Sequence, residues 1–315
     1  MFIFRISRRS FQTSSIWLAT DKALLSKLRK STGYTFANCK KALEVSNNDL
    51  AKAEQWLKEQ ALALGWAKAA KVAGRSTSQG LIAITTDPKT ASVVEINCET
   101  DFVAKNATFR EVVIKASNAC FNVAKSQTNF IDSVAKMNLE TAQLSQLHSP
   151  DGKPLSDEIA LLVSQVGENV SLRRAMCLNV ADDLFVAGCT HPSLDVQGST
   201  LTGKYGSLLL YKKNSNETEA DHIAKQLCVH VIGMKPSKIG DIEKDLPKEN
   251  KDEETVMIHQ EFIMEPETPV FEILTSSGLS LVEFFRFECG EEIKPIDSSE
   301  NNKEEAEKMY AEAAK

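Results

Sequence analysis

The stretch that most constrains the fold is residues 80–123, where the hydrophobic pattern changes from alternation to a helical period. Residues 80–85 and 91–96 are two β-rich runs, and the Thr-Asp-Pro-Lys-Thr sequence between them is typical of a turn. A helical pattern then extends from about residue 107 to residue 123. The sequence therefore predicts an antiparallel hairpin followed by a helix.

One heptapeptide, residues 97–103 (Asn-Cys-Glu-Thr-Asp-Phe-Val), joins the second strand to this helix. A carboxylate, a large aromatic ring and a β-branched residue at such a corner can project together from a rigid base. This arrangement suits insertion into a partner better than it suits a catalytic pocket. Spacing alone favours the alternative that Phe102 and Val103 are core residues capped by Asp101, because most such residues serve packing.

The same order of elements returns later in the chain. Residues 205–212 read as a strand and residues 219–231 as a helix, so we expect two related α+β subdomains with antiparallel sheets. Alternating strands and helices are also common without duplication, and that alternative stays open. Between the two halves, residues 130–166 read as helical in two pieces, and residues 190–203 read as a loop.

The N-terminal region predicts a small helical bundle. Residues 21–59 give three short amphipathic helices, the last capped by Asn47 or Asn48. Residues 61–75 read as a helical linker interrupted by Gly65. A bundle of about forty residues has little core of its own, so we expect it to dock on a partner or on the next domain.

Length and composition indicate a protein of two or three domains, since the chain has 315 residues of which 42% are apolar. The predicted organisation is a leader, a three-helix domain, two core subdomains and an acidic tail, at residues 1–20, 21–66, 67–182, 183–295 and 296–315.

The first twenty residues have the composition of a mitochondrial transit peptide, with three arginines, several serines and no acid. They predict a mitochondrial matrix protein; a disordered arm on a cytosolic protein is the alternative. Subtracting their +3 from the net charge of −6 leaves −9 for the remainder, which argues against direct binding of nucleic acid. No apolar segment is long enough to span a membrane, so no membrane association is expected.

The sequence predicts neither a metal nor a cofactor. Its seven cysteines are scattered without any C-x-x-C pair, as expected for reduced thiols. The best metal candidates, His222, Cys228 and His230, are spaced six and eight residues apart and do not converge on one helix face.

Two further patterns imitate catalytic sites. Residues 198–205 resemble a phosphate-binding loop, but Tyr205 replaces the magnesium-binding hydroxyl residue and a strand follows where a helix is required. Cys98 lies beside two carboxylates, but no histidine is near in sequence, and strand alternation turns Cys98 toward the core. We therefore predict no catalytic residues.

Five ordered blocks carry a resemblance to a known family. They are residues 28–33 with 38–43, residues 97–105, Gly167-Glu168-Asn169 with Arg173-Arg174, His230-Val231 with Met234 and Pro236, and Phe285-Arg286-Phe287-Glu288. From about residue 25 to residue 291 the sequence resembles elongation factor Ts of the mitochondrial type. The second block is highly specific.

The resemblance implies a guanine-nucleotide exchange factor that acts on mitochondrial elongation factor Tu, without covalent chemistry of its own. By position, Asp101 and Phe102 correspond to the pair that intrudes near the magnesium and phosphate sites of the GTPase, with Val103 anchoring their base. His191 corresponds to the family's core histidine, although Pro192 follows where the family tends to have glycine.

The resemblance also implies that the N-terminal bundle, with Leu28, Arg29 and Gly33, grips the GTPase domain. Residues 240–260 are too short and too acidic for the long coiled coil of bacterial relatives, so we expect a heterodimer with the GTPase rather than a stable homodimer. Two other classes are the alternatives: a ubiquitin-binding adaptor, because residues 21–59 resemble ubiquitin-associated bundles, and an enzyme with Cys98 as nucleophile.

Overall fold

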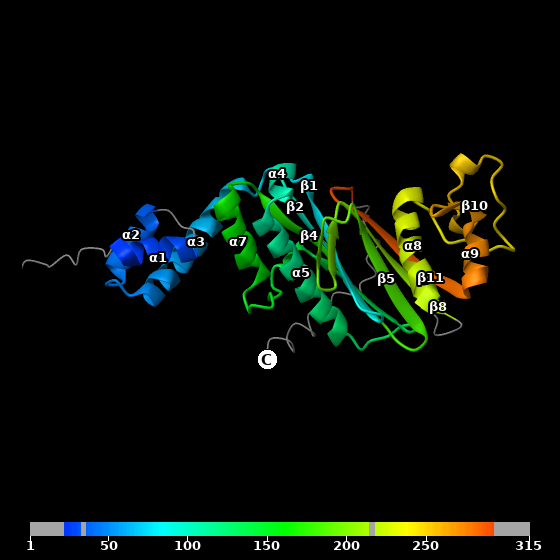
Figure 1. The fold of residues 1–315 in the computed structure, drawn as a ribbon, viewed down its shortest axis with the longest axis horizontal. Coiled ribbons are helices and arrows are strands. Elements are labelled where there is room, and N and C mark those ends of the chain that lie inside the picture. Colours follow the sequence, from blue (N-terminus) through cyan, green and yellow to red (C-terminus); the bar gives the residue numbers. More distant parts are fainter. Residues whose placement is uncertain (1–21, 33–35, 214–217, 293–315) are drawn as a thin grey trace, which may run out of the picture.

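The computed structural model describes residues 22–32, 36–213 and 218–292, and its architecture is α+β, as predicted. Figure 1 shows an elongated molecule with a helical bundle at one end and antiparallel sheets beyond it. The bundle comprises α1 (Lys22–Thr32), α2 (Phe36–Val45) and the first part of α3 (Leu50–Val72), packed around a small apolar cluster. The expected leader and acidic tail lie outside the described residues.

The third helix is longer than the sequence predicted. Its N-cap is Asp49, whose carboxylate accepts the backbone N–H groups of Ala51 and Lys52, so the prediction of an asparagine cap was wrong. It passes without interruption through Gly65 and through the expected domain boundary between residues 66 and 67.

Gly65 is a contact point rather than a break. A Cβ atom there would lie 2.3 Å from the carbonyl oxygen of Ala160 in α7 (Leu155–Val166), so glycine lets the two helices approach closely. Beside it, the indole N–H of Trp66 donates to Asp157 Oδ1 at 3.2 Å. The bundle is thus joined to the core through a helix that packs on the core.

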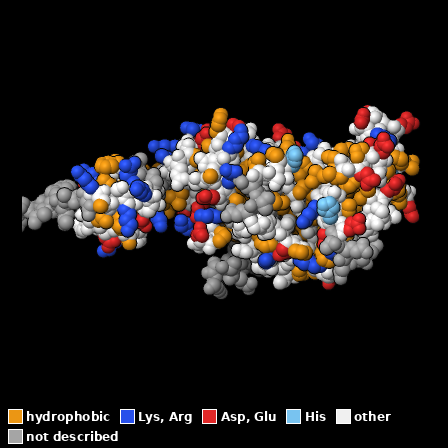
Figure 2. All heavy atoms as spheres, in the orientation of Figure 1, with side chains coloured by type: hydrophobic (Ala, Val, Ile, Leu, Met, Phe, Trp, Pro, Cys, Tyr) orange, Lys and Arg blue, Asp and Glu red, His pale blue; other side chains and the backbone are white. Residues whose placement is uncertain are grey.

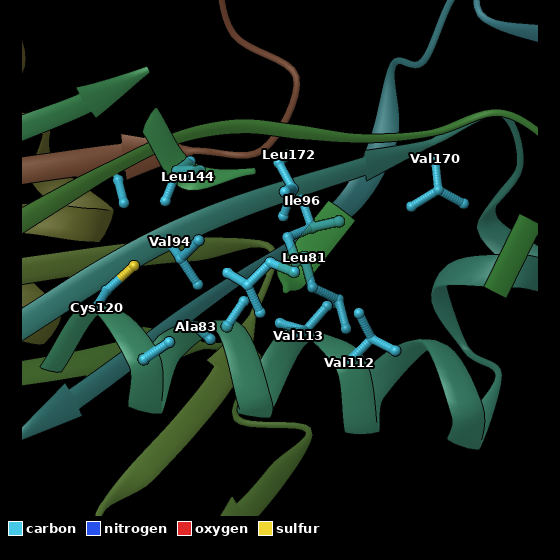
Figure 3. Close-up of a cluster of buried hydrophobic side chains, with 14 of the residues drawn as sticks. Leu81, Ala83, Val94, Ile96, Val112, Val113, Cys120, Leu144, Val170 and Leu172 are labelled. Carbon is cyan, nitrogen blue, oxygen red and sulfur yellow. The ribbon is translucent and has the colours of Figure 1, made fainter. Parts of the chain in front are cut away.

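The larger sheet has six strands and is covered on one face by α5 (Ala107–Ser126) and α7. Figure 3 shows side chains of the hairpin packing against α5 in the apolar cluster that lies between the larger sheet and its covering helices. The spatial order of the strands is β3 (Val134–Glu140), β4 (Val170–Val180), β2 (Thr90–Cys98), β1 (Gln79–Thr86), β7 (Thr200–Gly203) and β6 (Asp195–Gln197).

The smaller sheet has three strands in the order β11 (Leu279–Glu288), β8 (Tyr205–Lys213) and β5 (Leu184–His191). Its outer face packs on α8 (Thr218–Met234) and α9 (Val270–Ser277), next to the short hairpin of β9 (Glu261–Phe262) and β10 (Glu265–Pro269).

The two sheets also pack on each other, which explains the continuous burial of the central hairpin. Ile82 and Ile84 of β1 contact the apolar cluster that includes Leu208 and Leu210 of β8, whereas Leu81 faces the cluster under α5. The core therefore has four layers: helices, sheet, sheet and helices (Figure 1).

Two sequence predictions were wrong in the middle of the chain. Residues 134–140 form edge strand β3, although they were expected to be helical, because pairing with β4 and burial of alternate side chains outweigh helix propensity. Residues 190–203 were expected to be a loop but contain β6 and β7, and β7 pairs with β1. The expected boundary between residues 182 and 183 therefore does not separate the two sheets.

Candidate functional site

The heptapeptide forms a sharp corner at which Phe102 points outward. Strand β2 ends at Cys98, and the one-turn helix α4 (Asp101–Ala104) begins three residues later with Thr100 as its N-cap. The Phe102 side chain is 79% exposed, whereas Val103 is buried in the cluster beneath α5. The alternative that Phe102 is a core residue is wrong. Val103 is the buried residue at the base of the corner.

Asp101 is ionised and paired in the free protein. Its carboxylate oxygen Oδ2 lies 2.7 Å from Nζ of Lys105, one helical turn later, and the hydrogen bond from this ammonium lowers the pKa of Asp101. The pair is partly exposed to solvent, so its contribution to stability is small. A carboxylate and an aromatic ring thus stand side by side on a short, exposed helix.

Cys98 faces the core, as strand alternation predicted. It is fully buried, and its thiol donates to the carbonyl oxygen of Thr100 at 3.1 Å. Burial, reinforced by the charge of Glu168, raises the pKa of Cys98 to about 12. The thiol is therefore protonated at neutral pH and is not an activated nucleophile.

His191 is exposed at the end of β5, and the His191–Pro192 peptide bond is cis. The carbonyl oxygen of His191 accepts the backbone N–H of Lys204 at 3.0 Å. The side-chain Nζ of Lys204 lies 3.2 Å from Oε1 of Gln79. Gln79 pairs with Cys98 in the hairpin register. Through this chain of contacts, His191 lies at the same end of the sheets as the corner that carries Phe102.

Lys204 itself was missed by sequence reasoning, which treated residues 198–205 only as an imitation of a phosphate loop. Its ammonium also contributes to the lowered pKa of Asp101, although the Lys105 hydrogen bond is the larger cause. Residues 198–205 contain all of β7 and the first residue of β8, so a strand follows the segment where a phosphate-binding loop requires a helix.

The N-terminal bundle presents a second candidate surface. Leu28 is fully buried in the bundle core, Arg29 is exposed, and Gly33 lies outside the described residues. A shallow groove of about 550 Å³ is lined by Lys22, Leu25, Ser26, Arg29, Lys30 and Phe36. Figure 2 shows Lys and Arg side chains over this bundle, while Asp and Glu gather over the far end of the molecule.

The histidine and cysteine cluster considered as a metal site is not brought together. His230 is buried; its Nε2 donates to Oε1 of Gln260 at 3.0 Å, because Nδ1 must accept the backbone N–H of Ile263 at 3.3 Å. Burial lowers the pKa of His230, which favours this neutral form. Within residues 22–32, 36–213 and 218–292, no group of three or more potential metal ligands converges.

In the same described ranges, no helix is both long and apolar enough to cross a bilayer.

Matches to known protein families cover both the N-terminal bundle and the corner. The family model described as "Elongation factor Ts, mitochondrial, N-terminal" matches residues 8–67, and the model "Elongation factor TS" matches residues 99–255. The chain is 47% identical over 290 residues to mitochondrial elongation factor Ts of Aedes aegypti, covering 90% of this chain and 93% of that protein. Identity to the Drosophila melanogaster protein is 43% (86% and 86% covered), and identity to the Homo sapiens protein is 36% (87% and 84% covered).

Proposed function

The chain belongs to the mitochondrial elongation factor Ts family of translation elongation factors, and we propose that it binds mitochondrial elongation factor Tu·GDP and promotes GDP release. In this proposal Asp101 and Phe102 enter the GTPase near its magnesium and phosphate sites. The family is one of nucleotide-exchange factors, so no covalent chemistry is assigned to the chain.

The observation that carries the proposal is the exposure of Phe102 on a fixed base. Phe102 is 79% exposed between residues that are partly or fully buried, so its ring is accessible to a partner. Because Val103 and Ala104 are buried directly behind it, the backbone of the corner is already ordered before binding. A pre-organised group loses less conformational entropy when it binds.

The energetics are compatible with one aromatic wedge assisted by other contacts. Exchange requires tighter binding to the nucleotide-free GTPase than to its GDP form, and linkage makes that ratio equal the factor by which GDP is weakened. A thousandfold weakening corresponds to about 4 kcal/mol. Burial of one phenylalanine supplies roughly 1.5–3 kcal/mol. The remainder is assigned to Asp101, whose negative charge would disturb the ordered water around the magnesium ion.

Other surfaces would hold the partner in place. We assign the groove beside Arg29 on the N-terminal bundle to binding of the GTPase domain, with residues 21–66 as the binding domain and α3 as its connection to the core. His191 is assigned a contact from the second core subdomain, at the same end of the sheets as Phe102. The expected product is a heterodimer with elongation factor Tu in the mitochondrial matrix. A stable homodimer detected by light scattering would contradict this assignment.

The test is release of fluorescent GDP from purified mitochondrial elongation factor Tu, followed by stopped flow. The Phe102→Ala variant should lower the maximal release rate by about 10- to 150-fold, as expected for loss of roughly 1.5–3 kcal/mol of apolar contact. Complex formation should be partly retained. An unchanged release rate in this variant would remove Phe102 from the mechanism.

Phe130→Ala is the matched control, because Phe130 is also exposed (40%) but follows the C-terminal end of α5. Helix α4 precedes the other end of α5, and a helix of 20 residues spans about 30 Å. Release by the Phe130→Ala variant should match that of the unsubstituted protein.

A further inference from the structure

The backbone that carries Phe102 is bonded to a carboxylate from another part of the sheet. Glu168, which precedes β4, accepts the Thr100 backbone N–H at 3.0 Å and the Thr100 hydroxyl at 2.7 Å. Thr100 Oγ1 in turn accepts the N–H of Val103 at 3.4 Å. Because a hydroxyl has one hydrogen, donation to Glu168 fixes its rotation and leaves a lone pair for Val103. The carboxylate therefore orients the N-cap of the helix on which Phe102 stands.

A second carboxylate makes the reciprocal bond. Oε1 of Glu99 accepts the backbone N–H of Asn169 at 2.6 Å, so residues 99–100 and 168–169 each bond the backbone of the other. The amide of Asn169 also donates to the carbonyl oxygen of Arg75 at 2.8 Å, just beyond α3. The corner is thus fastened both to the start of β4 and to the end of the helix that comes from the N-terminal bundle.

These bonds matter because little else fixes the direction of Phe102. Its ring is exposed, so packing within this chain does not orient it. Helix α4 has four residues, too few to be stable from its own hydrogen bonds. Its direction depends on the buried side chains of Val103 and Ala104 and on the Glu168 bonds to Thr100, which are strong because the acceptor is charged.

We propose that Glu168 is a positioning residue for nucleotide exchange, which holds the Thr100 cap so that Phe102 is aimed at its site in the partner. This role rests on the proposed function, in which Phe102 is the wedge. The orientation of Phe102 affects the rate of the step in which its ring enters the GTPase. Binding of the two proteins draws on the bundle and on the rest of the core as well. Loss of Glu168 should therefore lower the maximal rate of GDP release more than it weakens the complex.

The experiment compares Glu168→Ala and Glu168→Gln with the unsubstituted protein in stopped-flow GDP release over a range of exchange-factor concentrations. Glu168→Ala should lower the maximal rate about tenfold, the size expected for lost hydrogen bonds to a charged group. The half-saturating concentration should change by no more than about twofold. Glu168→Gln should be intermediate, because one amide oxygen can accept from only one of the two Thr100 donors and its NH2 group opposes the other.

Asp87→Ala is the matched control. Asp87 also accepts two backbone N–H groups, those of Lys89 and Thr90, at 2.9 and 2.7 Å, but at the opposite end of the same hairpin. This variant removes a comparable set of bonds without touching the corner, and its maximal rate should match that of the unsubstituted protein. An equal slowing of Asp87→Ala and Glu168→Ala would show general destabilisation and overturn the positioning role.

A double-variant cycle separates positioning from an independent effect. If Glu168 acts through Phe102, the Phe102→Ala/Glu168→Ala protein should be no slower than Phe102→Ala alone. Multiplied effects, or a wild-type maximal rate for Glu168→Ala, would overturn the proposal while the exchange function stands. Absence of any release by the unsubstituted protein would overturn both. Should circular dichroism show Glu168→Ala unfolded, the same cycle with Glu168→Gln decides the matter.

Discussion

At the scale of single residues, neighbours in the heptapeptide have opposite environments. Phe102 is exposed and Val103 is buried, while Cys98 is enclosed beneath the corner. The buried pair anchors the backbone, and the ring of Phe102 stays accessible to solvent. Burial of Cys98 in the core also raises the pKa of its thiol, so the thiol stays protonated at neutral pH.

Cys98 should be chemically inert and dispensable for exchange. In the native protein at about pH 8, below the raised pKa of the thiol, iodoacetamide should leave Cys98 unmodified in peptide mass spectrometry. Cys98→Ala should retain GDP release. Rapid alkylation of Cys98, or loss of release in a folded Cys98→Ala protein, would revive the enzyme hypothesis.

The same thiol has a predictable effect on alkaline stability. The pKa of Cys98 in the folded protein, about 12, exceeds the ordinary value of 9.0. The contribution of the protonated thiol to the free energy of unfolding is therefore complete below pH 9.0 and is lost as the pH rises from there toward the folded pKa. Between about pH 8 and about pH 10, the melting temperature of the unsubstituted protein should therefore fall more than that of Cys98→Ala.

At the scale of elements, α3 connects the bundle to the core through a close helix contact. Gly65 lies directly against the backbone of α7, and Trp66 and Lys68 of α3 make polar contacts with the same helix. These three contacts fall within about one turn of α3, which therefore docks directly on α7. The position of the bundle relative to the corner is set by this packed helix and not by a loose linker.

Gly65→Ala should destabilise the protein although alanine is the better helix former. Helix propensity favours alanine by about 1 kcal/mol, but the new Cβ atom would collide with a backbone oxygen that cannot move aside cheaply. Gly74→Ala is the control, because a Cβ atom there meets nothing within 4 Å. We expect a lower melting temperature and faster proteolysis between bundle and core for Gly65→Ala only; equal behaviour of the two variants would contradict the contact.

At the scale of the whole molecule, a buried carboxylate ties the end of the described chain to the centre of the larger sheet. Glu95 on β2 is fully buried; its carboxylate lies 2.9 Å from Arg173 and 2.7 Å from Arg174, and it accepts the N–H of Gly290 at 2.8 Å. Arg174 also bonds Glu291 at 2.6 Å. Since residues 290 and 291 follow β11, this network holds the smaller sheet against the larger one.

Removal of Glu95 should therefore be costly. Glu95→Ala leaves two partly buried guanidinium groups without their shared partner, for which we expect a loss of about 3–5 kcal/mol in the free energy of unfolding. Glu283→Ala is the control: its ion pair with Lys136, at 3.0 Å, is partly exposed, and we expect a loss of at most about 1 kcal/mol. Urea denaturation measures both; similar losses would show that the buried network adds nothing special.

The sequence by itself determined the elements whose signals are local. Residues 79–126 form the predicted strand, turn, strand and helix, since alternation, turn residues and a helical period are read within a few positions. Strand alternation also predicted correctly that the Cys98 side chain faces the core. The ordered blocks identified the family, and with it the residues of the corner that are proposed to act.

Only the tertiary structure decided what depends on partners far along the chain. Residues 134–140 became a strand because β4 offers an edge to pair with, and β7 joined β1 across more than a hundred residues of sequence. The exposure of Phe102 and the Glu168 bonds to Thr100 belong to the same class. Burial, and hydrogen bonding between strands, depend on surfaces formed by residues far apart in the sequence. A local pattern can therefore locate the corner but cannot show which way its side chains point.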